Sequence, residues 1–70
     1  MAYFEVILQY QSGRPADGVK VSNSWDSKDH FTNAEGKVLI EAGSPDLGIF
    51  VHGKSYGRVK PGKTLLTLDR

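Results

Sequence analysis

Short runs in which apolar and polar side chains alternate dominate this chain, and turn residues separate them. Residues 2–11 are the clearest case, because Phe4, Val6 and Leu8 fall on one face of an extended strand and Glu5 falls on the other. In a helix, the apolar residues of this run would surround the axis on all sides. The content of β-branched and aromatic residues also favours a strand.

The same alternation continues to the end of the chain and predicts six or seven strands. Turn signals recur at intervals of roughly 8–12 residues, which is typical of a small sandwich or barrel. The eight glycines and three prolines fit a chain that turns often. We therefore expect an all-β fold, a small sandwich of six or seven mostly antiparallel strands. The expected runs after the first are residues 19–22, 30–33, 37–41, 47–53, 54–58 and 64–69.

The segment Asn33-Ala34-Glu35-Gly36 predicts a hairpin that joins the runs 30–33 and 37–41. Alternation within each run then assigns the residues that point inward. The predicted core consists of Phe4, Val6, Leu8, Val19, Val21, Phe31, Val38, Ile40, Ile49, Val51, Val59 and Leu66.

The length of 70 residues limits the chain to one domain, residues 1–70, with a small core. Without cysteine there is no disulfide framework and no thiolate zinc site. The longest apolar run has three residues, far short of the roughly 20 that a membrane-spanning helix needs.

We expect no enzyme and no cofactor, because the core uses nearly every apolar side chain. No signal-peptide pattern opens the sequence, which favours the cytoplasm unless the chain is part of a secreted protein.

Three segments resemble carboxypeptidase regulatory-like domains. Residues 13–21 have the family's glycine-proline segment followed by a valine-x-valine strand, and residues 32–40 have its threonine-asparagine-glycine turn and alternating strand. Residues 48–56 resemble its next strand, although Ser55 precedes Tyr56 where the family usually has glycine. The resemblance covers residues 4–68. It implies a small prealbumin-like or immunoglobulin-like sandwich that serves as a structural or binding module. The closing Tyr-Arg-Gly-Ser signature of transthyretin-like ureide hydrolases, which share this fold, is absent.

Two chemical alternatives involve side chains outside the predicted core. His30 and His52 could form a metal or acid–base site with a nearby acid, which would be Asp26, Asp29 or Glu41. No pair of these residues has the close spacing of metal ligands, so two surface histidines are the simpler interpretation. An isopeptide bond from Lys20 to Asp69 beside Glu41 would need a buried amine. Lys20 alternates with inward valines and is expected to face solvent.

Basic residues concentrate near the end of the chain. Residues 1–49 carry four basic and seven acidic groups, net −3, whereas residues 50–70 carry five basic groups and one acid, net +4. Basic and aromatic residues on strands could bind single-stranded nucleic acid or another polyanion. The sequence pI of about 8.0 argues against a dedicated binder, and lysines also protect strand edges from aggregation. The candidate residues are His52, Lys54, Tyr56, Arg58, Lys60 and Lys63.

Trp25 stands in the polar segment 22–28 and is the second candidate surface. A tryptophan among Ser, Asn and Asp could stack on a sugar ring or anchor a protein partner. It could also cover one open end of the sandwich, which is the simpler interpretation because so small a core needs large aromatic side chains. The favoured function is a non-enzymatic structural or interaction module whose partner the sequence does not specify, although a protein or a carbohydrate would suit it. Nucleic-acid or polyanion binding by residues 52–63 is the alternative. The sequence does not specify the oligomeric state.

Overall fold

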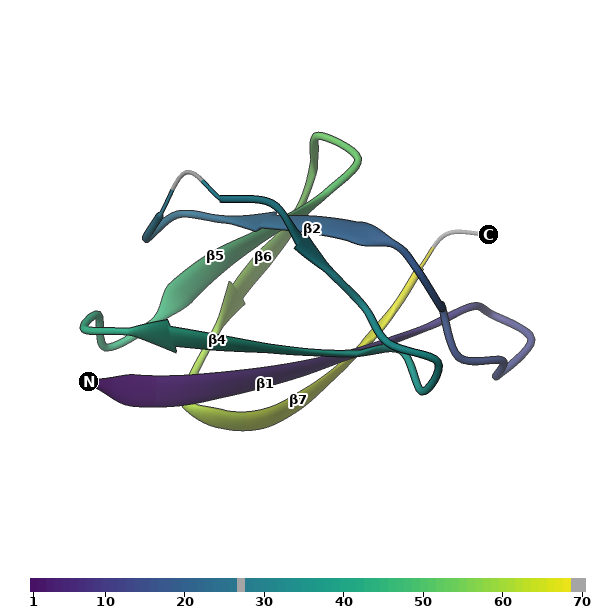
Figure 1. Ribbon diagram of the computed structural model, residues 1–70, viewed down its shortest axis with the longest axis horizontal. Helices are drawn as coiled ribbons and strands as arrows, with labels where there is room; N and C mark the ends of the chain where they lie inside the picture. Colours follow the sequence, from purple (N-terminus) through teal and green to yellow (C-terminus); the bar gives the residue numbers. More distant parts are fainter. Residues whose placement is uncertain (27, 69–70) are drawn as a thin grey trace.

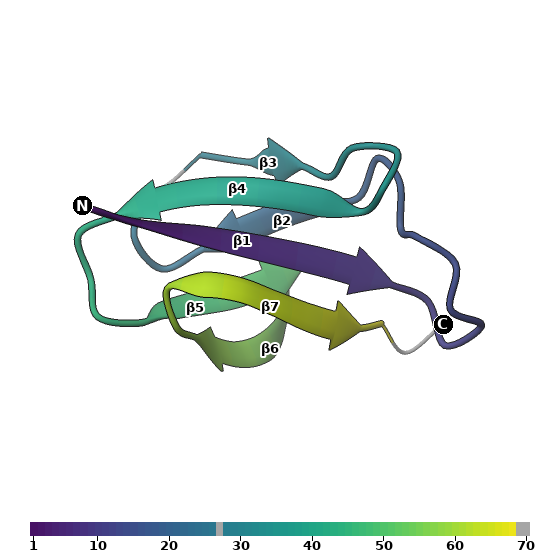
Figure 2. The ribbon, with the colours of Figure 1, turned by 90° about the horizontal axis from the view of Figure 1, so that it is seen from below.

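The computed structural model describes residues 1–26 and 28–68, which form seven strands in two facing sheets (Figures 1 and 2). In Figure 2 the sheet that contains β1 lies in front of the other. The strands are β1 (Ala2–Gln9), β2 (Lys20–Asn23), β3 (His30–Phe31), β4 (Lys37–Ala42), β5 (Leu47–Val51), β6 (Lys54–Val59) and β7 (Gly62–Thr67).

The first sheet has the order β4-β1-β7 and the second the order β3-β2-β5-β6. Strand β1 is antiparallel to β4 and parallel to β7, and every pair in the second sheet is antiparallel. The predicted fold class, a small all-β sandwich of mostly antiparallel strands, is confirmed. None of the described residues form a helix long and apolar enough to cross a membrane.

The core lies between the sheets and follows the alternation in the sequence. Ten of the twelve predicted core residues are buried, and Leu66 is half-buried against the same cluster. Four buried apolar residues were not in the predicted set, and they are Ala16, Ala42, Leu47 and Leu68.

The prediction for Phe31 is wrong, because its side chain is 63% exposed. The expected hairpin across residues 33–36 is also wrong as a strand pairing, since β3 pairs with β2 and β4 pairs with β1. The turn itself exists, with Gly36 N–H donating to the Asn33 carbonyl at 2.9 Å, but it carries the chain from one sheet to the other. Phe31 lies opposite Lys20 in the β2–β3 ladder and shares its outward face, because directly opposed residues point the same way.

Strand β6 contains a bulge, as its glycine suggested. Two residues, Tyr56 and Gly57, stand opposite Ile49 alone, and Gly57 has a φ of 87°. The extra residue reverses the alternation along the strand. Tyr56 therefore packs against the core before the bulge and Val59 is buried after it, while Arg58 is exposed.

Candidate functional site

The two candidate surfaces lie at opposite ends of strand β5. The loop with Trp25 follows Asn23, which pairs with Ile49, whereas His52 directly follows Val51 at the other end of the strand. Five residues of β5 separate the ends, about 16 Å at roughly 3.3 Å per residue. In Figure 1 the loop between β2 and β3 lies at the left with the N-terminus, and the β5–β6 turn projects at the top.

The loop around Trp25 is organised by a buried asparagine. The Asn23 side chain accepts hydrogen bonds from the backbone N–H groups of Trp25 and Asp26, both at 2.9 Å. Its amide nitrogen donates to the Asp26 carboxylate at 3.2 Å. Asn23 is only 7% exposed, so these bonds satisfy polar atoms that water does not reach. An asparagine that bonds the backbone two and three residues ahead closes a tight turn, and here it holds the Trp25 backbone in place.

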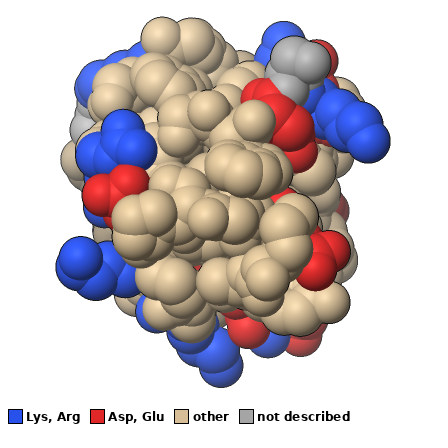
Figure 3. Space-filling view, turned by 90° about the vertical axis from the view of Figure 1, so that its left-hand side faces the viewer, with Lys and Arg blue, Asp and Glu red and all other residues tan. Residues whose placement is uncertain are grey.

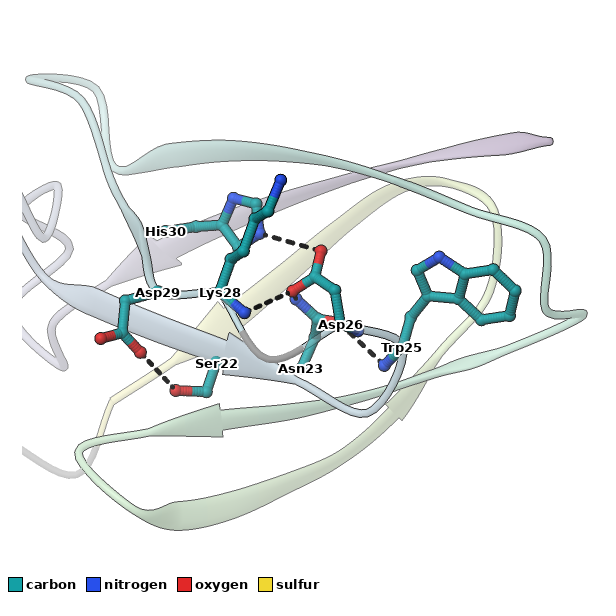
Figure 4. A network of polar contacts seen from close by, with 7 residues as sticks. All are labelled: Ser22, Asn23, Trp25, Asp26, Lys28, Asp29 and His30. Atoms are coloured by element: carbon teal, nitrogen blue, oxygen red, sulfur yellow. Dashed lines mark hydrogen bonds and ion pairs between the residues drawn. The ribbon is translucent and has the colours of Figure 1, made fainter.

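Asp26 continues this network toward the start of β3 (Figure 4). Its carboxylate accepts a hydrogen bond from the Lys28 backbone at 3.0 Å and lies 3.5 Å from Nε2 of His30. Partial desolvation raises the pKa of the Asp26 carboxyl, but the bonds from Lys28, Asn23 and His30 outweigh it and hold the pKa below its ordinary value. The carboxylate is therefore charged near neutral pH and acts as an acceptor within the loop.

A second set of bonds ties the same loop to β5. Ser24 N–H donates to the Gly48 carbonyl at 3.0 Å, and Gly48 N–H donates to the Ser24 hydroxyl at 2.9 Å. A Cβ at Gly48 would lie 3.3 Å from the Cβ and Oγ atoms of Ser24, which shows how closely the Ser24 side chain packs on this position. Trp25 is thus flanked on both sides by residues that are hydrogen-bonded to the sandwich.

The Trp25 ring is 48% exposed despite this ordered backbone. One edge rests on the turn between β4 and β5, because a Cβ at Gly43 would lie 3.2 Å from Cη2 of the indole. The Met1 sulfur approaches the same point at 3.6 Å. Figure 3 shows this end of the molecule as an uncharged centre with Lys, Arg, Asp and Glu around its rim. The indole therefore contacts the β4–β5 turn along one edge and leaves about half of its surface open to solvent.

A pocket of about 330 Å³ opens at the other end of β5. Val19, Val51 and Leu68 are buried and form its apolar floor, and the half-buried rings of Tyr10 and Tyr56 line it. Three of the predicted partner-binding residues meet here, since His52 and Lys54 line the pocket together with Tyr56. Tyr10 was missed, because strand alternation identifies a face but not a neighbour across the sandwich.

The remaining basic residues of the stretch 52–63 lie elsewhere. Arg58 donates to the Asp46 carboxylate at 2.7 Å, which raises the pKa of Arg58, and the same hydrogen bond lowers the pKa of Asp46. Lys63 is on β7 in the other sheet, in register with Glu5. Lys60 also lies close enough to Asp46 to lower its pKa. The three cations therefore lie at two places, Arg58 and Lys60 near Asp46 and Lys63 beside Glu5.

The other chemical candidates are not gathered into one site. Within residues 1–26 and 28–68, no group of three or more His, Asp or Glu could hold a metal ion. His30 contacts Asp26, while Asp29 accepts a long 3.5 Å hydrogen bond from Ser22. Lys20 is exposed, as its alternation indicated, and Asp69 lies outside the described residues.

Comparison of the chain with known protein families and with curated proteins finds no match. The residues themselves must therefore carry any functional conclusion. Asn23 and Gly43, which position Trp25, were not predicted from the sequence. An asparagine two residues before an aromatic in a polar loop is a weak signal for such a turn, and nothing local marks Gly43 as a contact of the indole.

Proposed function

We propose that this protein is a non-enzymatic interaction module that binds a protein partner through the Trp25 end of its sandwich. The observation that carries the proposal is a half-exposed tryptophan on a loop whose backbone is tied down by Asn23 and Ser24. A rigid loop loses little conformational entropy on binding, so the apolar surface of the indole contributes more of its burial energy to affinity.

The surface around Trp25 supports this role. Protein interfaces combine a core depleted in charge with a polar rim, and tryptophan is enriched among the residues that dominate binding energy. Figure 3 has this arrangement, with an uncharged centre and charged groups around it.

The two facing sheets of mostly antiparallel strands support the resemblance to carboxypeptidase regulatory-like domains at the level of a small β-sandwich. We infer that the chain belongs to the prealbumin-like group of β-sandwiches. Its members mostly act as spacers or binding surfaces, which is consistent with an interaction role.

The test is affinity capture with the immobilised chain, comparing wild type with Trp25→Ala. The matched control is Phe31→Ala, which removes another exposed aromatic from a different part of the surface. We expect a specific partner to be retained by wild type and Phe31→Ala and lost with Trp25→Ala. Retention by Trp25→Ala, or binding competed by simple oligosaccharides, would contradict a protein interface at this end.

Gly43→Ala provides a graded variant of the same test. Its new methyl group would press on the indole at 3.2 Å, so the ring must move by a few tenths of an ångström. We expect weaker partner binding with an unchanged far-UV circular dichroism spectrum. Equal affinity for wild type and Gly43→Ala would show that the exact position of the ring does not matter.

Polyanion binding by residues 52–63 is the competing proposal. Retention on heparin that falls steeply with added salt would support it, because phosphate or sulfate contacts release counterions. The pairing of Arg58 with Asp46 at 2.7 Å and the separation of Lys63 into the other sheet favour elution at low salt.

A further inference from the structure

We propose that the pocket beneath the β5–β6 turn binds a small aromatic carboxylate. This site is separate from the Trp25 end and does not depend on the protein interface proposed there. Its volume of about 330 Å³ is at the lower end of the range for ligand pockets, which suits a ligand with a single ring.

The walls of the pocket select for an apolar, planar group. Val19, Val51 and Leu68 are each at most 6% exposed and present aliphatic surface at the floor. Tyr10 follows β1 in one sheet, Tyr56 lies on β6 in the other, and both are half-buried against the core. Aromatic rings pack favourably edge-to-face or offset against a further ring, so two tyrosines favour an aromatic ligand over an aliphatic one.

The rim of the pocket selects for negative charge. The Lys54 ammonium lies 5.5 Å from the centre of the Tyr56 ring, a cation–π contact that orients it at the pocket. His52 lines the same rim and supplies a ring nitrogen as a second polar group. A carboxylate between these groups would receive a charge-assisted hydrogen bond while its ring enters the apolar part.

The backbone at His52 is an independent sign of function. His52 and Gly53 have φ values of 53° and 81° and form the two-residue link between Val51 and Lys54. Positive φ at both positions is typical of a type I′ turn, in which asparagine is the favoured first residue. Histidine in a left-handed conformation stores strain, and such strain concentrates at binding sites. Position 52 therefore carries an imidazole at the pocket, although asparagine would suit the turn better.

The first test is a titration of the ¹⁵N-labelled full chain with sodium phenylacetate, monitored through backbone amide shifts. We expect saturable shifts at Val19, at Val51 to Tyr56 and at Leu68. Neutral phenylacetamide and the non-aromatic cyclohexylacetate should each bind at least about fivefold more weakly, a difference of roughly 1 kcal/mol. Equal binding of the amide or of the cyclohexyl acid overturns the assigned ligand class.

Two variants locate the charge recognition. Lys54→Met should weaken phenylacetate binding about fivefold, while Lys20→Met, which removes an exposed lysine from β2, should leave it unchanged. Shifts confined to the Trp25 loop, or no saturation by about 10 mM phenylacetate, overturn the site.

His52→Asn separates binding from folding. Asparagine suits the left-handed turn, so we expect the midpoint of thermal unfolding to rise while phenylacetate affinity falls severalfold. Unchanged affinity in this variant would remove His52 from the site. Loss of affinity in a variant that unfolds at a higher temperature cannot come from a misfolded pocket.

Discussion

Replacing Gly36 by alanine should destabilise the fold far more than the same change at a glycine of similar conformation. Gly36 has a φ of 78°, and an alanine in this left-handed region costs about 1–2 kcal/mol. A Cβ at this position would also overlap the carbonyl oxygen of Leu8 and lie 3.1 Å from the Ala16 nitrogen. The turn cannot accept the methyl group unless its backbone moves away from β1.

That movement would break hydrogen bonds where the end of β1 meets this turn and the segment that precedes β2. Leu8 N–H donates to the Gly36 carbonyl at 2.8 Å, and Ala16 N–H donates to the Leu8 carbonyl at 3.0 Å. The loss of both adds about 2 kcal/mol at roughly 1 kcal/mol each. We therefore expect Gly36→Ala to lower the free energy of unfolding by about 3–4 kcal/mol, a large share of the roughly 4–10 kcal/mol typical of a chain this long.

Gly53→Ala is the matched control, because Gly53 has a φ of 81° and nothing lies within 4 Å of the position that an added methyl group would occupy. It should cost only the conformational penalty of about 1–2 kcal/mol. Urea unfolding followed by far-UV circular dichroism and by the fluorescence of the single tryptophan measures both variants. Destabilisation that is equal within about 0.5 kcal/mol would refute the argument from the Leu8 contact.

The remaining predictions concern a buried hydroxyl, an exposed ring and a loop carboxylate. Thr32→Val should cost about 2 kcal/mol in urea unfolding, because the buried hydroxyl accepts from Val19 N–H and donates to the Ala16 carbonyl. Phe31→Ser should change stability by less than about 0.5 kcal/mol in the same assay, since the ring is exposed. Asp26, whose pKa is lowered on folding, stabilises the loop above pH 3.8 and loses this effect on further acidification. Asp26→Asn should therefore flatten the acid transition in tryptophan fluorescence, and an unchanged transition would contradict the role of this carboxylate.

Much of the secondary structure and core could be predicted from the order of residues. Phe4, Val6 and Leu8 are fully buried, as their spacing indicated, because the pleat of a strand alternates side chains whatever its neighbours are. The bulge in β6 also agrees with the glycine at its centre. These features depend on local backbone geometry, which a short stretch of sequence specifies.

The candidate sites were predicted less completely. Trp25 and His52 were identified by residue type, but the contact of Trp25 with the Gly43 turn and the approach of Tyr10 to the pocket join segments distant in the chain. The stretch 52–63 looked like one basic surface in the sequence. The bulge and the crossing from β6 to β7 turn its side chains in different directions.

The sequence by itself determined that this chain forms short strands, which face of each strand is apolar, and where the chain turns. Only the tertiary structure decided which strands pair, and Phe31 shows the difference. Alternation placed it on one of two faces, but its partner in β2 put that face toward solvent. The physical reason is that side-chain alternation is a property of a single strand, whereas the direction of the core depends on the register between strands and on the packing of the two sheets.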